Sequence, residues 1–206
     1  SGFIFDRLLK ESKAYIYQMR NLIFLLLLVV GASAFAQSEL LAKNYFNQGE
    51  YEKALTIYEK LYRKSPGRLD YLKALVESNQ QLENFEESER LLNERLNSTR
   101  SLPQLYVDLG YNYSLQNLDI EASKNYDLAI EAVKSRPNYV FIIGKSFENY
   151  NLLDQAVIVY ESAMELNPDL DFNGQLARIY GEQGKLEEMF SKYIDLIEKN
   201  PSSRTK

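Results

Sequence analysis

The sequence predicts an all-α fold, a solenoid of about five antiparallel helix-turn-helix units. The first observation is a repeat of about 34 residues, because one apolar helix pattern occurs five times along the chain. In each unit this helix follows another apolar-periodic segment and a short polar turn. The prolines give further support, because proline costs about 3 kcal/mol inside a helix and all five fall between the expected units. They are Pro66, Pro103, Pro137, Pro168 and Pro201.

The first helix of each expected unit carries a large apolar residue, a mostly small residue and usually an aromatic residue on one face. A small residue at this position lets two helices approach closely. The triplets are Leu41, Ala42 and Tyr45; Leu75, Val76 and Asn79; Leu109, Gly110 and Tyr113; Ile143, Gly144 and Phe147; and Leu176, Ala177 and Tyr180.

The second helix of each unit places a small residue four positions before an aromatic or apolar one. The second unit departs most, with Ser88 and Asn79 at core positions, so we expect wider or wetter packing there. In the last unit Met189 replaces the small residue, which should push the adjacent helix outward or suit a terminal cap. The pairs are Ala54 and Tyr58, Ser88 and Leu92, Ala122 and Tyr126, Ala156 and Tyr160, and Met189 and Tyr193.

The repeats fill the chain from Gln37 onward, and no polar-faced capping helix follows the last unit. We therefore expect a solenoid over residues 37–206, in a natural chain that continues beyond Lys206. The expected units cover about residues 37–68, 69–102, 103–136, 137–169 and 170–202.

The start of the chain has the organisation of an export signal. From Met19, a basic residue precedes the apolar run Leu22 to Val30, and small residues follow up to Ala36. This order predicts a signal peptide over residues 19–36, because the apolar run is shorter than the roughly 20 residues that span a bilayer. An uncleaved membrane anchor is the alternative. Residues 1–18 are interpreted as an upstream extension or as non-native.

Composition excludes several kinds of chemistry. Cysteine and histidine are absent from the 206 residues, which removes disulfides, thiolate nucleophiles, imidazole bases and Cys/His metal sites. The net charge of -5 and the absence of a basic patch argue against nucleic acid, and no glycine-rich phosphate loop is present. We expect no enzyme activity, catalytic residue, cofactor, metal or small-molecule substrate. A hydrolase that uses acidic residues alone is the remaining enzymatic alternative.

This pattern resembles the tetratricopeptide repeat, with its L-G-x2-Y first helix, A-x3-F second helix and closing proline. Units three and four fit best, through Gly110 with Ala122 and Gly144 with Ala156, while the usual first-helix tryptophan is missing. The resemblance implies a right-handed superhelix whose first helices line a concave groove for a protein partner.

The resemblance also gives candidate groove residues, on first helices but outside the packing positions. The middle of the set is aromatic and apolar, so we expect a bound peptide or helix to be anchored by Tyr111 and Phe141 and steered by cations. Packing within the core, or a merely solvated face, is the alternative for each residue. Glu77 stands where the family's carboxylate-binding members have asparagine, which disfavours that mode. The candidates are Lys43, Phe46, Lys73, Glu77, Val107, Tyr111, Phe141, Lys145 and Arg178.

The functional expectation is an exported scaffold for protein-protein interaction, in the periplasm or cell envelope of a bacterium. An extracytoplasmic sensor or interaction domain of a longer bacterial regulator is the alternative, with a kinase or DNA-binding output elsewhere in the natural chain.

Overall fold

A computed structural model of the chain describes residues 19–21, 37–98 and 102–199. Every regular element in these residues is a helix, which confirms the predicted all-α fold. The chain divides into two compact units, Ser1–Ser78 and Asn79–Lys206, which we describe separately. The proposed extension at 1–18 and most of the proposed signal peptide lie outside the described residues.

In the first unit, residues 37–47 are helical and are followed by α2 (Tyr51–Lys64) and most of α3 (Leu69–Gln81). Ala42 and Ala54 are fully buried, as expected for small residues at a helix crossing. The Tyr71 hydroxyl donates to Glu39 at 2.8 Å, which ties α3 to the preceding helical segment. The predicted break at Pro66 lies between α2 and α3.

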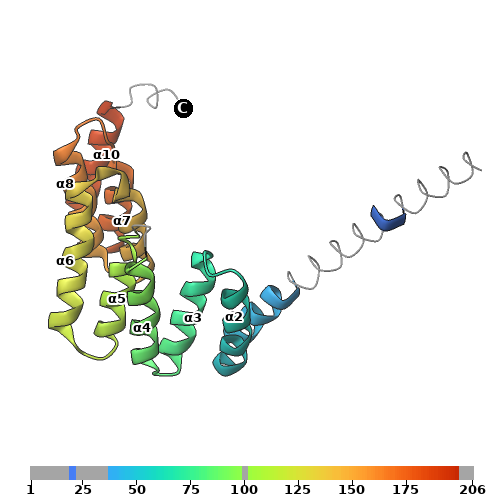
Figure 1. Ribbon diagram of the computed structural model, residues 1–206. Coiled ribbons are helices and arrows are strands. Elements are labelled where there is room, and N and C mark those ends of the chain that lie inside the picture. Colours follow the sequence, from blue (N-terminus) through green and yellow to red (C-terminus); the bar gives the residue numbers. More distant parts are fainter. Residues whose placement is uncertain (1–18, 22–36, 99–101, 200–206) are drawn as a thin grey trace, which may run out of the picture. The chain divides into compact units, whose positions relative to one another are not determined.

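The second unit contains consecutive antiparallel helix pairs (Figure 1). α5 packs on α6, α7 on α8 and α9 on α10, while α4 packs against α5 and α6 against α8. This order matches the predicted alternation of first and second helices. The helices are α4 (Phe85–Leu96), α5 (Leu105–Ser114), α6 (Asp119–Ser135), α7 (Val140–Asn149), α8 (Leu153–Leu166), α9 (Asn173–Glu182) and α10 (Leu186–Lys199), with a short 3-10 helix, η1 (Pro137–Tyr139), before α7.

Each turn between a first and a second helix has the same backbone geometry. One residue has a positive φ, and the next residue donates its N–H to the carbonyl five positions earlier at 2.8–3.0 Å. This is the Schellman arrangement, which satisfies carbonyls at a helix end. The positive-φ residues are Gly49, Glu83, Asn117, Asn151 and Gly184.

Glycine is required where a first helix crosses a second. A Cβ on Gly144 would lie 2.5 Å from Cζ of Tyr160, and one on Gly110 would lie 2.4 Å from Cε1 of Tyr126. Real Cβ atoms do not approach so closely, so the tyrosine ring occupies the space that a first-helix side chain would take. The small position of the first helix and the aromatic position of the second helix are therefore in direct contact.

The repeat that departs most from the pattern buries several polar side chains. The buried Gln80 donates to Asn112 at 3.2 Å, and Asn112 donates to the Phe85 carbonyl at 3.1 Å. Ser88 is fully buried at the position that holds alanine in the better copies. Polar side chains here satisfy one another, as buried polar groups generally must.

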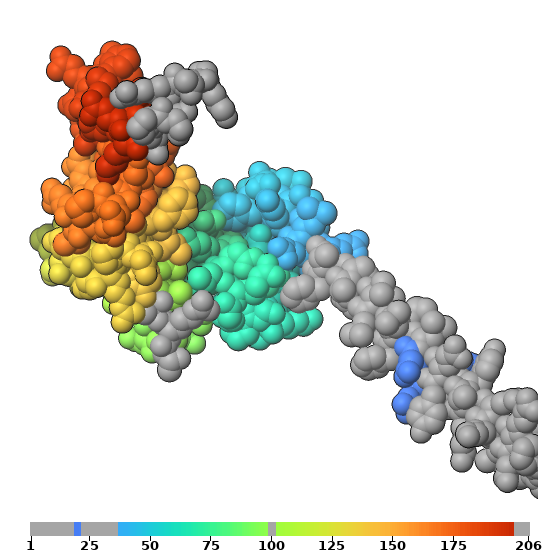
Figure 2. Space-filling view, turned by 90° about the horizontal axis from the view of Figure 1, so that it is seen from above, coloured from blue at the N-terminus to red at the C-terminus, as the bar shows by residue number. Residues whose placement is uncertain are grey.

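The last helix, α10, has no buried residue, and it forms the end of the second unit (red in Figure 2). The sequence predicts that Met189 pushes the adjacent helix outward or suits a terminal cap. In the structure its large side chain lies beside Gly181, where an added Cβ would lie 3.0 Å from the methionine sulfur. A small residue on the first helix thus accommodates the large residue on the second.

The glycine contact predicts opposite effects for two Gly→Ala changes. Gly144→Ala should lower the free energy of unfolding by about 1–3 kcal/mol, because the ring of Tyr160 must move. Gly174→Ala is the matched control, since its Cβ would meet only Leu196 at 3.8 Å, and it should stabilise by about 0.5–1 kcal/mol. Urea denaturation followed by circular dichroism measures both. Equal effects of the two changes would contradict the proposed contact.

Candidate binding surface

Three first helices of the second unit, α5, α7 and α9, carry most of the predicted groove residues. The name first-helix surface is used below for Tyr111, Phe141, Lys145, Glu148 and Arg178. Four of these were predicted from sequence, and Glu148 is added by the structure. Lys145, Glu148 and Arg178 are joined by ion pairs, while Tyr111 and Phe141 lie on the first helices α5 and α7.

Phe141 is the most exposed aromatic residue of this surface. Its side chain lies in the first turn of α7 and is 60% exposed, although Val140 and Ile143 beside it are buried. Helical spacing places Lys145 and Glu148 four and seven positions later on the same side of α7. An aromatic ring therefore stands in solvent next to a group of charged side chains.

Glu148 is the centre of that charged group. Its side chain is only 5% exposed and accepts hydrogen bonds from the Lys145 ammonium at 3.0 Å and the Tyr160 hydroxyl at 2.8 Å. Arg178 of α9 contacts the same carboxylate at 2.5 Å and also reaches Glu182 at 2.6 Å. The charges of Lys145 and Arg178 balance those of Glu148 and Glu182. The network joins α7, α8 and α9.

The pKa of Glu148 reflects a competition between burial and its polar partners. Burial opposes the charged form, but hydrogen bonds from Tyr160 and Lys145 and the charge of Arg178 outweigh it and lower the pKa. Burial and the neighbouring carboxylate raise the pKa of Tyr160, so its hydroxyl keeps its proton. The carboxylate is therefore ionised and the tyrosine remains a donor at neutral pH.

Tyr111 has a packing role as well as a surface position. Its ring stacks on that of Tyr150, with centroids 4.0 Å apart and planes 17° apart. The Tyr150 hydroxyl in turn donates to the buried Asp108 of α5 at 2.7 Å. Removal of Tyr111 would therefore disturb the junction of α5 and α7 as well as the surface.

The other predicted residues lie in the core of the second compact unit or belong to the first compact unit. Val107 is fully buried in the core with Ala129 and Ile143, and this corrects the expectation that it faces a partner. The reason is that two neighbouring helices cover this position of α5. Lys43, Lys73 and Glu77 belong to the first compact unit, where Lys43 is exposed and the other two are half-buried.

Sequence reasoning missed Glu148 and Tyr150. A signal existed for Glu148, which follows Lys145 by three positions and can pair with it along one helix. The contact of Glu148 with Arg178, a residue of the next repeat, depends on how α7 and α9 pack. Patterns in a single sequence do not predict this packing. Tyr150 lies in a polar turn, where its ring carried no periodic signal.

Within 19–21, 37–98 and 102–199, no group of three or more acidic side chains is placed to hold a metal ion. In the same residues no helix has both the length and the apolar character to cross a bilayer.

A family model and a human protein each match part of the chain. The family model described as tetratricopeptide repeat matches residues 40–67. A human protein, protein O-mannosyl-transferase TMTC1, is 27% identical over 154 residues, which are 73% of this chain but only 17% of that protein. The chain thus spans less than a fifth of the length of that relative.

Two solved structures are similar in fold. A thermophilic TPR protein of Thermus thermophilus, TTC0263, is 18% identical with a TM-score of 0.46, over 81% of this chain and 92% of the other. The type III secretion translocator chaperone SycD of Yersinia enterocolitica is 15% identical with a TM-score of 0.48, over 59% of this chain and 90% of the other.

The Glu148 contacts predict a pH-dependent contribution to stability. Glu148→Gln should lower the free energy of unfolding by about 1–3 kcal/mol at pH 7, because charge-assisted hydrogen bonds are lost. The pKa of Glu148 is lower in the folded state than in the unfolded state, where it is near 4.5. Its carboxylate therefore stabilises the fold fully above the unfolded pKa, and this stabilisation is lost as pH falls through the folded pKa. The difference between wild type and variant should therefore shrink on acidification below about pH 4.5. Urea titrations across pH measure it, and a constant difference would contradict the assignment.

Proposed function

The chain belongs to the tetratricopeptide-repeat family, and we propose that it is an exported scaffold that binds a peptide or helix of a partner protein along its first helices. The observation that carries the proposal is Phe141, an aromatic side chain 60% exposed on a first helix. Aromatic residues that can be desolvated on binding are frequent anchors at protein interfaces. The proposed role is binding, since the sequence lacks the histidine and cysteine used by most protein nucleophiles and bases.

The surroundings of Phe141 favour a rigid surface. Lys145 and Arg178 are held by Glu148, so binding would cost little side-chain ordering at these positions. The Tyr111–Tyr150 stack adds a second aromatic group at the other end of α7. An extended peptide or an amphipathic helix with spaced apolar residues fits this distribution.

The charge balance changes the expected role of the cations. The sequence suggested that Lys145 and Arg178 steer an acidic partner. In the structure both are paired with Glu148, and Arg178 also pairs with Glu182, so little net field remains. We therefore propose that apolar contact at Phe141 supplies most of the affinity, and that the ion pairs fix the shape of the surface.

Export is supported by the order of residues at the start of the chain. Arg20, the apolar run after it and the small residues ending at Ala36 are typical of a secretory signal. We propose that the repeat region acts outside the cytoplasm, in a bacterial envelope, where a chain without cysteine has no thiol to oxidise.

Binding through Phe141 can be tested against a control of equal exposure. Peptides selected on the 206-residue chain from a random phage library should bind Phe141→Ala at least tenfold more weakly, as a hot-spot contact requires. Phe190→Ala is the matched control, because Phe190 is also 60% exposed but lies on the second helix α10. Isothermal titration measures the affinities. Equal loss in both variants would place binding elsewhere.

Export predicts a defined amino terminus. When the chain is expressed from Met19 in a bacterium, mass spectrometry of the envelope fraction should find a mature protein that begins at Gln37. Ala36→Tyr should block cleavage, because the processing site requires a small residue. A full-length product retained in the cytoplasm would contradict export, and an uncleaved product in the membrane would support an anchor.

A further inference from the structure

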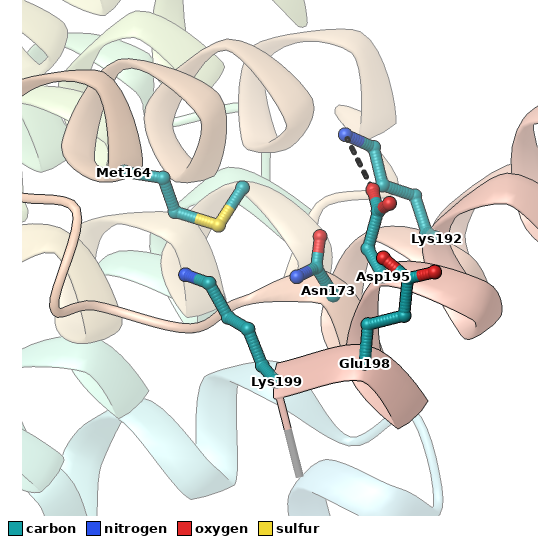
Figure 3. A pocket seen from close by; sticks show the side chains of 6 residues that line it. All are labelled: Met164, Asn173, Lys192, Asp195, Glu198 and Lys199. Atoms are coloured by element: carbon teal, nitrogen blue, oxygen red, sulfur yellow. Dashed lines mark ion pairs between the residues drawn. The ribbon is translucent and has the colours of Figure 1, made fainter. Parts of the chain in front are cut away.

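A solvent-open cavity of about 460 Å³ lies between α8, the start of α9 and α10 (Figure 3). Sequence reasoning gave no sign of it, because its residues are contributed by three helices. Its lining combines two lysines, two carboxylates, one amide and one apolar side chain. These are Lys192, Lys199, Asp195, Glu198, Asn173 and Met164.

Asn173 is the feature that distinguishes this cavity from an ordinary surface hollow. The residue is 4% exposed, and its side-chain amide makes no hydrogen bond to any residue that the structure describes. Only its backbone N–H is engaged, with Asp171 at 3.0 Å. The amide atoms remain accessible to solvent through the cavity, where they lie between the charged groups (Figure 3). It presents a donor and an acceptor together.

The charged groups around Asn173 retain hydrogen-bonding capacity. The Lys192 ammonium is 4.0 Å from both Asp195 and Glu161, too far for a hydrogen bond. Lys199 donates to the carbonyls of Pro168 and Leu170, each at 3.1 Å, which uses two of its three protons. Within the described part of the chain, Glu198 has no ion pair.

The cavity also has a fixed apolar wall. The sulfur of Met164 accepts the Phe172 N–H at 3.3 Å, which holds the thioether in place beside the amide. A methionine wall suits apolar groups of varied shape.

The balance of charge selects the ligand class. Inorganic anions would be repelled by Asp195 and Glu198, and metal cations by the two lysines. A ligand that carries an ammonium and a carboxylate on one carbon can pair with both kinds of charge, and the amide of Asn173 can donate to the carboxylate and accept from the ammonium.

We propose that this cavity binds a free α-amino acid with an apolar side chain. The ligand carboxylate lies toward Lys192, Lys199 and the Asn173 N–H groups. Its ammonium lies toward Asp195 and Glu198, and its side chain contacts Met164. A peptide terminus supplies only one of the two charges, so the site favours the free amino acid over either end of a chain. This site is separate from the proposed peptide-binding surface.

The test compares L-leucine with two analogues on the 206-residue chain. Isothermal titration at millimolar ligand should show saturable binding of L-leucine. N-acetyl-leucine, which lacks the ammonium, and leucine amide, which lacks the carboxylate, should each bind roughly tenfold or more weakly. Absence of leucine binding, or equal affinity of the three compounds, would overturn the proposal. Tighter binding of one analogue would identify a site for a peptide terminus instead.

Variants locate the binding without disturbing the fold. Glu198→Gln changes an exposed carboxylate, so it should weaken L-leucine roughly tenfold and leave N-acetyl-leucine unchanged. Glu165→Gln is the matched control, an exposed carboxylate of α8 that does not line the cavity, and it should bind L-leucine as wild type does. Equal weakening by both changes would refute this location.

Discussion

The packing of a second-helix tyrosine on a first-helix glycine sets the separation of the two helices in the best-formed repeats. At Gly110 and Gly144 the tyrosine ring lies where a Cβ would be, so the backbones approach as closely as the ring allows. That approach buries Ala122 and Ala156 and brings the first helices into a row. The exposed position of Phe141 and the convergence of charges on Glu148 both follow from this spacing.

The same tyrosines connect the interior with the surface. The ring of Tyr160 is buried, whereas its hydroxyl reaches Glu148, and the Tyr180 hydroxyl likewise reaches Glu161 at 2.9 Å. Burial and the nearby carboxylate raise the pKa of Tyr180 to about 12, so the phenol remains a donor. A phenylalanine would fill the same space but would leave the carboxylate without this partner. Core packing and surface charge are therefore linked through single side chains.

The sequence was sufficient for the repeat, because each helix pair follows from local periodicity and from residues that recur at fixed spacing. It also placed Phe141 and Arg178 on first helices, where the structure has α7 and α9. It did not distinguish Val107 from its neighbours, because burial there depends on the helices that cover α5. Nor did it reveal the Glu148 network or the cavity at Asn173, whose members come from different repeats. Contacts within one repeat were predictable from the sequence, whereas contacts between neighbouring repeats required the structure.

The turns between first and second helices are closed by backbone hydrogen bonds, whatever side chain occupies the positive-φ residue. Glutamate, asparagine and glycine all serve there. The side chain at the positive-φ residue is therefore not needed to close the turn, although the number of residues in each turn is fixed. These positions can change in charge and shape over evolution without altering the helix pairs. A new specificity, natural or engineered, could be placed there independently of the first-helix surface.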